Sequence, residues 1–340
     1  MLYRRFTSRK SIGRFVYRTG IRKASSLVGK SGRVYKHDQV LQKRWGQKPS
    51  VLKAFSGDES FVLKRVRKHF YELSQTLAAE FAGSRRLRMH IDCSEREDIL
   101  VYPYYRETLL DIIQSDPDFP ITERKKILQR VGEAIQELHA RDWIHIDVKP
   151  DNILVNWTSD SSGQKTVSDV ALGDFDLVFK SEGGKTRETP YAVGNAMWRS
   201  PEGQTGRGVT KASDIFSFGL VCIYTLGGGE FLLLNDYKEL AERGVSAEQE
   251  ILTRHFTYFG PVTEGLYKQV DDKNWCEAMK SSSERADWLA KDDPELRFSW
   301  WSQELGSAAK DMICGMTDLD PAARLPIDHV LSHSWWQDVD

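Results

Sequence analysis

Charged and amide side chains crowd the stretch WIHIDVKPDNILVN, where Asp147 and Asn152 lie five positions apart with Lys149 between them. A second acidic pair, Asp174 and Asp176, follows the next apolar run. Carboxylate and amide oxygens suit Mg²⁺, which usually completes its shell with water and substrate phosphates. A nearby lysine can neutralise a transferring phosphoryl group, and a separate carboxylate can orient a hydroxyl nucleophile. The pattern therefore favours phosphoryl-transfer chemistry.

The alternative interpretation is a polar turn in which Asp and Asn side chains cap backbone groups. The segments NILVNW and VALGDFDLV are predicted to be short strands around the polar loop TSDSSGQKTVSD. One polar loop would fit the capping interpretation. Two loops of matching chemistry around one hairpin favour a metal and phosphate site.

Other elements must hold these loops in place. The runs PSVLKAF and SFVLKRV, joined by the turn-like SGDE, predict a β-hairpin. The segment KHFYELSQTLAAEFAGSRRL spaces Phe70, Leu73, Leu77 and Phe81 as a helix does. DILVYPYY is predicted to be a strand, TERKKILQRVGEAIQELHARD a long helix, and most of the remaining chain helical. The expected architecture is a small sheet-rich lobe, a connector near residues 103–106 and a larger helical lobe.

Composition limits the class of protein. The chain has 340 residues, 40% of them apolar, with 48 basic and 49 acidic side chains, so no global attraction to nucleic acid or anionic lipid is expected. The longest apolar run, FGLVCIYTLGGGEFLLL, is interrupted and too short to cross a bilayer, so we expect no transmembrane segment. The four cysteines are scattered outside CxxC pairs, which favours a reducing compartment such as the cytoplasm or nucleus.

The amino-terminal segment differs from the remainder in charge. Residues 1–36 carry eleven Lys and Arg side chains and no Asp or Glu. The segment is predicted to be a basic flexible tail that contacts acidic partners or phosphates. The alternative is a targeting segment, because an acid-free, Arg- and Ser-rich leader is typical of mitochondrial import.

The polar motifs resemble a known family. HIDVKPDN resembles the catalytic loop H-R-D-L-x-x-x-N of the eukaryotic protein kinases, and DFD resembles their D-F-G motif. The resemblance implies that Asp147 is the catalytic base and that Lys149 stabilises charge on the γ-phosphate. It also implies that Asn152 and Asp174 are magnesium ligands. A lysine two residues after the aspartate is typical of serine/threonine-directed members.

Three motifs further along the chain extend the resemblance. RSPE resembles the A-P-E motif that ends the activation segment, and DPAARL supplies Arg324, which in the family pairs with the glutamate of that motif, here Glu202. SDIFSFGLV resembles the buried helix whose aspartate, here Asp214, braces the catalytic loop. HVLSHSWW resembles the closing helix of the domain. The ordered set is more specific than any single motif.

The small lobe matches less closely. FVLK stands in the place of V-A-I-K, which implies that Lys64 binds the α- and β-phosphates. Strand alternation also places Lys64 on the same face as Val62, although a lysine there can instead run over the sheet to solvent. Lys53 on the preceding strand competes for this role. Glu80 is the predicted helix partner of Lys64, preferred to Glu72 because it leaves enough chain for the helix to pack back on the sheet.

Several positions depart from the family pattern. The three glycines of the nucleotide loop correspond to Arg44, Gly46 and Pro49, so Gly46 and the following Val51 remain as nucleotide contacts. Proline has no backbone N–H to offer a phosphate, and weaker nucleotide binding is expected. Asp176 replaces the glycine of D-F-G.

Two further departures concern regulation and acceptor positioning. Ile146 replaces the arginine that clamps a phosphorylated activation loop in many members. Asn195 stands where serine/threonine-specific members usually have threonine.

The Trp-rich region 227–307 has no match in the family pattern, and its tryptophans belong either to the core or to a docking surface.

The sequence thus predicts an α+β, bilobal protein-kinase-like fold across residues 37–338, with an N-lobe at 37–103 and a C-lobe at 104–338. The predicted function is an ATP- and Mg²⁺-dependent serine/threonine kinase acting on protein substrates, with no specific nucleic-acid partner. The main alternative is a pseudokinase scaffold. A small-molecule phosphotransferase is disfavoured by Lys149, RSPE and Arg324, and a nucleic-acid role rests on the basic tail alone. The sequence does not indicate the oligomeric state.

Overall fold

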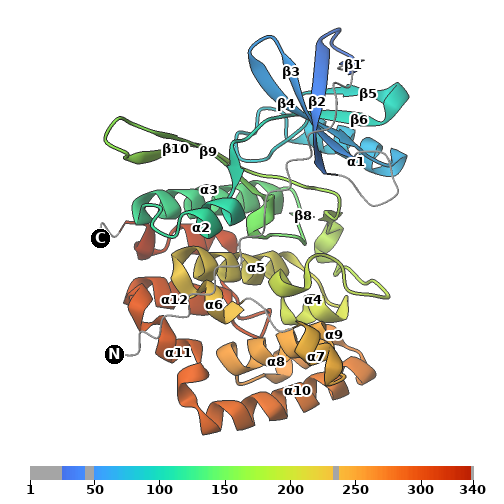
Figure 1. Cartoon of the computed structure of the whole chain (residues 1–340). Helices are drawn as coiled ribbons and strands as arrows, with labels where there is room; N and C mark the ends of the chain where they lie inside the picture. The colour runs from blue at the N-terminus through green and yellow to red at the C-terminus, as the bar shows by residue number, and fades with distance from the viewer. Residues whose placement is uncertain (1–24, 43–49, 233–236, 338–340) are drawn as a thin grey trace. The chain divides into compact units, whose positions relative to one another are not determined.

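The computed structural model describes residues 25–42, 50–232 and 237–337, which fall into two compact units (Figure 1). Unit 1 comprises the chain up to Val66 together with residues 91–102. Unit 2 comprises residues 67–90 and everything from Pro103 onward. The predicted α+β organisation, with one sheet-rich part and one mainly helical part, is confirmed.

Among the described residues, the sheet of unit 1 has six strands, hydrogen-bonded in the order β1-β2-β3-β4-β6-β5. The strands are β1 (Ser25–Val28), β2 (Val34–Gln42), β3 (Val51–Ser56), β4 (Glu59–Arg65), β5 (Asp92–Ser94) and β6 (Ile99–Pro103). β3 and β4 form the predicted hairpin. Its turn contains Gly57 at φ +60°, a conformation that glycine adopts without steric cost.

One face of this sheet carries the core of unit 1. The register pairs Leu52 with Leu63 and Ala54 with Phe61, so these four side chains point to the same side. They join a cluster of buried side chains: Leu27, Tyr35, Ala54, Phe61, Leu63, Ile99 and Val101. The alternate residues of the β3–β4 hairpin therefore point to the opposite face of the sheet, away from this core.

The sheet begins at Ser25, ahead of the domain boundary predicted at residue 37, so that boundary was placed too late. The basic composition of this segment predicted a flexible tail, so its strands were not predicted. The guanidinium of Arg33 donates to Ser56 and forms an ion pair with Glu59, so its charge is satisfied by the neighbouring hairpin. The part of the predicted tail that precedes Ser25 lies outside the described residues, and its targeting role stays a prediction.

In the part of unit 2 that the structure describes there are two small sheets, in the orders β10-β9-β7 and β11-β8. Their strands are β7 (Glu107–Thr108), β8 (Trp143–Ile144), β9 (Ile153–Ser159), β10 (Lys165–Leu172) and β11 (Phe179–Lys180). β9 and β10 are the two strands predicted around the polar loop. They pair antiparallel from Ile153 with Leu172 to Lys165 with Ser159.

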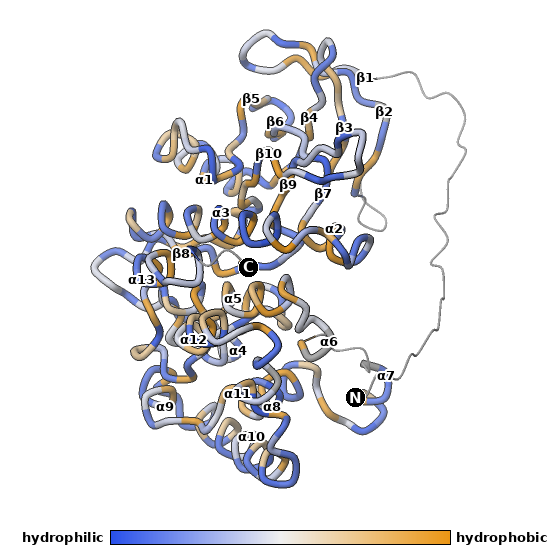
Figure 2. The backbone as a smooth tube through the Cα atoms, turned by 90° about the vertical axis from the view of Figure 1, so that its left-hand side faces the viewer, coloured by the Kyte–Doolittle hydropathy of each residue, from blue (hydrophilic) through white to orange (hydrophobic). Residues whose placement is uncertain are grey.

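The described part of unit 2 also contains helices. They are α1 (Lys68–Glu80), α2 (Leu109–Ser115), α3 (Ile121–His139), α4 (Pro201–Thr205), α5 (Lys211–Ile223), α6 (Gly229–Leu232), α7 (Tyr237–Glu242), α8 (Ala247–Phe259), α9 (Glu264–Val270), α10 (Lys273–Asp292), α11 (Phe298–Trp301), α12 (Ser307–Met316) and α13 (Ile327–Leu331). Helix α1 groups with unit 2, although the sequence placed it in the small lobe. The alternating blue and orange turns of α3 in Figure 2 follow its apolar stripe.

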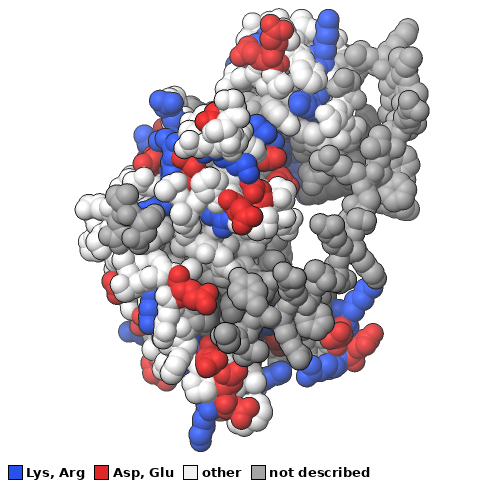
Figure 3. Space-filling view, turned by 60° about the vertical axis from the view of Figure 1, so that its left-hand side comes forward, with Lys and Arg blue, Asp and Glu red and all other residues white. Residues whose placement is uncertain are grey.

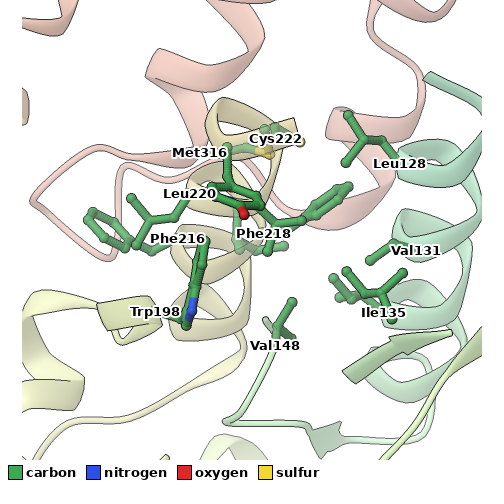
Figure 4. Packing of buried hydrophobic residues seen from close by; sticks show 14 of the residues in the cluster. Leu128, Val131, Ile135, Val148, Trp198, Phe216, Phe218, Leu220, Cys222 and Met316 are labelled. Carbon is green, nitrogen blue, oxygen red and sulfur yellow. The ribbon is translucent and has the colours of Figure 1, made fainter. Parts of the chain in front are cut away.

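Helix α5 runs through the core of unit 2. Every residue from Ser213 to Ile223 is buried, and Figure 4 shows Leu128, Val131 and Ile135 of α3 facing its side chains. Burial of each large apolar side chain stabilises the fold by roughly 1.5–3 kcal/mol. This packing fixes the amino-terminal turn of α5, which carries Asp214.

The described part of the Trp-rich region contains α6 to α11, and the indoles of Trp288 and Trp300 are not core residues. Trp288 is 65% exposed and Trp300 is 53% exposed, so the core interpretation is wrong for both. Acidic and basic side chains are interspersed on the face shown in Figure 3, consistent with the balanced charge of the chain. Within the described ranges, no helix combines the length and apolar character needed to cross a bilayer.

Candidate functional site

The strand register brings the two polar turns together. Ile153, the first residue of β9, pairs with Leu172, the last residue of β10, so the residues just outside the hairpin are also neighbours. The carbonyl of Asn152 accepts a hydrogen bond of 2.8 Å from the amide of Gly173. Asp174 is the next residue. The two side chains predicted as metal ligands therefore start from adjacent backbone positions.

Asp147 is buried and held through both carboxylate oxygens. Its Oδ2 lies 2.8 Å from the Lys149 ammonium and 3.0 Å from Nδ2 of Asn152. Its Oδ1 accepts a bond of 2.9 Å from the backbone amide of Asn195. Because Nδ2 of Asn152 also donates to the Asp147 carbonyl, the amide oxygen of Asn152 points away from Asp147. That oxygen is the atom that could bind a cation.

Asp214 fixes the backbone that precedes Asp147. Its carboxylate accepts the amide of His145 at 2.7 Å and the amide of Ile146 at 2.8 Å, and Nε2 of His139 lies 3.0 Å away. Ile146 has φ +70°, which is strained for a β-branched residue. Such strain persists only where the surroundings over-determine it, and the two bonds to Asp214 supply that constraint.

The DFD turn is anchored through its aromatic residue. Phe175 is buried, and its ring lies edge-to-face on the His145 imidazole with 5.3 Å between centroids. Nε2 of His145 lies 3.1 Å from the Gly173 carbonyl. Asp174 has φ +66°, and its side chain is exposed. A carboxylate from Asp174 and an amide oxygen from Asn152 form a hard-oxygen pair that fits Mg²⁺.

The ion pair implied by the family resemblance is present. Arg324 binds Glu202 bidentately at 2.7 and 2.9 Å, and both side chains are fully buried. Burial by itself disfavours the charged form of Glu202, but the charge and hydrogen bonds of Arg324, with a further bond from Ser213, lower the pKa of this carboxyl. The pair joins the start of α4 to the loop that follows α12.

Three of the residues considered for nucleotide binding, Val51, Lys53 and Lys64, can be placed on the sheet of unit 1. The register pairs Val51 with Lys64 and Lys53 with Val62, so both lysines lie on the face opposite the core of unit 1. This arrangement agrees with the predicted alternation and leaves the choice between Lys64 and Lys53 open. Gly46 lies outside the described residues.

Glu80 has a partner that the sequence did not suggest. Its carboxylate lies 3.1 Å from the ammonium of Lys180, which follows the DFD turn in β11. Lys64 belongs to unit 1 and Glu80 to unit 2, so their pairing stays a prediction. Glu72, the alternative, is exposed.

Sequence reasoning missed two groups of this site. The amide of Asn195 has no side-chain signal, and only the three-dimensional path of residues 193–199 places it on Asp147. Lys180 lies 100 positions from Glu80, and no motif links the two. A basic residue shortly after the DFD turn was the only available hint.

Comparison with known proteins agrees with this geometry. The protein kinase domain family model matches residues 29–336. Curated relatives include the sensor for unfolded proteins in the ER ire1 of Schizosaccharomyces pombe, 27% identical, and the serine/threonine-protein kinase PknA of Corynebacterium glutamicum, 26% identical. The matched regions cover 53% and 59% of this chain but only 20% and 42% of those relatives.

A human relative and a solved structure extend the comparison. Ribosomal protein S6 kinase alpha-1 of Homo sapiens is 26% identical over 67% of this chain and 24% of its own length. The crystal structure of the yeast RNA Pol II CTD kinase CTDK-1 complex contains a chain that matches with a TM-score of 0.65 at 14% identity, covering 95% of this chain and 97% of that one. At that identity the structural match concerns the fold alone.

Proposed function

Because the chain belongs to the protein kinase domain family, we propose that it is an ATP- and Mg²⁺-dependent kinase that phosphorylates serine or threonine residues of proteins. The observation that carries the proposal is the fixed Asp147 carboxylate beside Lys149, next to two turns that present hard oxygen ligands. Phosphoryl transfer relies on positioning and charge stabilisation, so this residue set is chemically sufficient.

Each residue has a defined role in this proposal. Asp147 orients the acceptor hydroxyl and receives its proton, and Lys149 stabilises negative charge on the transferring group. Asn152 and Asp174 would hold Mg²⁺, which would supply positive charge to neutralise the phosphates of the nucleotide. Lys64 is assigned to the α- and β-phosphates. Asn195, through its amide, prevents rotation of the Asp147 carboxylate.

The second candidate is a scaffold that binds partners with little or no phosphate transfer. It is favoured by the degraded glycine loop and by Asp176 in place of glycine. The two candidates differ in what they require of unit 2. A scaffold has no need of a strained backbone at Ile146 or of three donors on one buried carboxylate.

The test is transfer of labelled phosphate from ATP to a generic Ser/Thr substrate. We expect turnover by the wild-type protein and a fall of about 100-fold or more for Asp147→Asn, which removes the base. Asp160→Asn is the matched control, because Asp160 is an exposed aspartate of the β9–β10 loop and should change turnover by less than about 3-fold. Unchanged activity in Asp147→Asn would overturn the assigned role. No turnover, together with no ATP-dependent thermal shift in Mg²⁺ or Mn²⁺, would support the scaffold.

A further inference from the structure

The peptide group between Gly194 and Asn195 is held at both ends. Its N–H donates to Oδ1 of Asp147 at 2.9 Å, and its carbonyl accepts a hydrogen bond from Nη2 of Arg199. The peptide unit is planar and trans, so its N–H and C=O point in opposite directions. A guanidinium that fixes the carbonyl therefore also fixes the direction of the N–H. One rigid group links Arg199 to Asp147.

Glycine is required where this peptide begins. Gly194 has φ +88°, a backbone conformation that side-chain-bearing residues rarely adopt. A Cβ at this position would lie 2.9 Å from the Ile146 carbonyl oxygen and 3.3 Å from Oδ1 of Asp147. The backbone thus approaches Asp147 more closely than any other residue type would allow.

Arg199 is itself held in place by its surroundings. Its Nε donates to the carbonyl of Val193 at 2.9 Å, and its Nη1 lies 3.3 Å from Oε1 of Gln204. Gln204 is buried in α4, and its Nε2 donates to the carbonyl of Ala196 at 2.6 Å. The Arg199 guanidinium therefore donates to two successive carbonyls and one side chain at once. The ammonium of a lysine can reproduce this arrangement only in part.

We propose that Arg199 is a positioning residue for phosphate transfer, acting through the Gly194–Asn195 peptide to hold the Asp147 carboxylate in one orientation. With Lys149 and Asn152 on Oδ2, the amide on Oδ1 prevents rotation of the carboxylate. This inference rests on the proposed function, because it concerns the residue assigned as base.

Kinetics of Arg199→Met and Gly194→Ala test the proposal. We expect kcat for peptide phosphorylation to fall by about 10- to 100-fold, because small misplacement of a catalytic group is costly, while KM for ATP changes by less than about 3-fold. Arg199→Lys should recover part of the loss. Arg187→Met is the matched control, since Arg187 is a half-buried arginine of the same segment that donates to the Leu177 carbonyl instead, and it should leave kcat within about 3-fold.

Two readouts separate positioning from general destabilisation. The double variant Arg199→Met/Gly194→Ala should be no slower than the more severe single variant, because both changes act on the same peptide group. Amide hydrogen exchange at Asn195 should be at least about 10-fold faster in Arg199→Met than in the wild type, with exchange in α5 unchanged.

The outcomes distinguish this inference from the proposed function. Wild-type kcat in Arg199→Met, multiplicative losses in the double variant, or unchanged exchange at Asn195 would each overturn the role of Arg199. If the wild type itself shows no transfer, the proposed function fails, and the exchange measurement still decides whether Arg199 orders the peptide. If Arg199→Met does not fold, Arg199→Lys carries the same kinetic and exchange measurements.

Discussion

Removal of Arg324 is expected to be among the most destabilising single changes in unit 2. The substitution Arg324→Met keeps an apolar stem but leaves Glu202 buried without its charge partner, and both side chains are 0% exposed in the wild type. Arg324 also donates to the carbonyls of Ala212 and Asp318, which lose their partner as well. Removing one member of a buried pair typically costs about 3–5 kcal/mol.

This cost translates into a large thermal shift. For a domain of 150–250 residues, about 1 kcal/mol corresponds to roughly 2–4 °C, so a loss of about 4 kcal/mol predicts a fall in Tm of about 10 °C. Circular dichroism at neutral pH measures Tm, and urea unfolding measures the free energy. Both should be followed at 222 nm in the same buffer, so that unfolding of the helical unit dominates the signal.

The matched control is the double variant Glu202→Gln/Arg324→Met. It removes the buried charge along with its partner, so it should be more stable than Arg324→Met by at least about 1 kcal/mol. The reasoning fails if Arg324→Met unfolds within about 1 kcal/mol of the wild type. It fails equally if the double variant gains nothing over the single one, because the loss would then come from packing alone.

Three further outcomes are expected. Burial lowers the pKa of His255 to about 3, from an unfolded value near 6.5. Below pH 6.5 the unfolded state therefore binds a proton that the folded state does not, and the free energy of unfolding falls as the pH falls toward 3. His255→Phe should reduce the slope of the urea-unfolding free energy between pH 6 and 5 by about 1 kcal/mol per pH unit. Asp214→Asn places a side-chain NH₂ group against a backbone N–H, so two donors face each other. We expect the free energy of unfolding to fall by about 2 kcal/mol and kcat to fall about 10-fold. Lys180→Ala removes a partly exposed pair and should shift Tm by less than about 3 °C. Glu80→Gln should also raise KM for ATP if Glu80 pairs with Lys64.

The parts of the site that could be predicted from the sequence depend on short-range spacing. Asp147, Lys149 and Asn152 lie in one loop, and their mutual contacts follow from that proximity. The meeting of this loop with Asp174 follows from a hairpin whose two strands were recognisable by their apolar runs. Register then brings the loop ends together without any further information.

The parts that could not be predicted depend on long-range packing or on backbone groups. The amide of Asn195 reaches Asp147 across 48 positions, and its donor belongs to the main chain, which every residue type shares. Strand β1 was not predicted because the basic composition of its segment indicated a flexible tail. The charge of Arg33, in the turn after β1, is satisfied by Glu59 of the neighbouring hairpin, and no local sequence pattern indicates that contact. The exposure of Trp288 depends on which face of α10 packs against α8, and a tryptophan does not mark that face by itself.

Two structural features that lower the stability of the fold bear on the choice between enzyme and scaffold. A left-handed backbone at Ile146 costs roughly 1–2 kcal/mol, and the buried Asp214 that holds it must be desolvated as well. Neither cost improves a binding surface, because both groups are hidden from partners. Both instead fix the backbone that carries Asp147. Of the departures from the family pattern, Arg44 and Pro49 fall in the glycine loop, where they affect affinity for nucleotide more than the transfer step. The departures at Asp176, Ile146 and Asn195 leave Asp147, Lys149, Asn152 and Asp174 in place. We therefore propose that these departures weaken nucleotide binding and leave the transfer chemistry intact, as the kinase proposal requires.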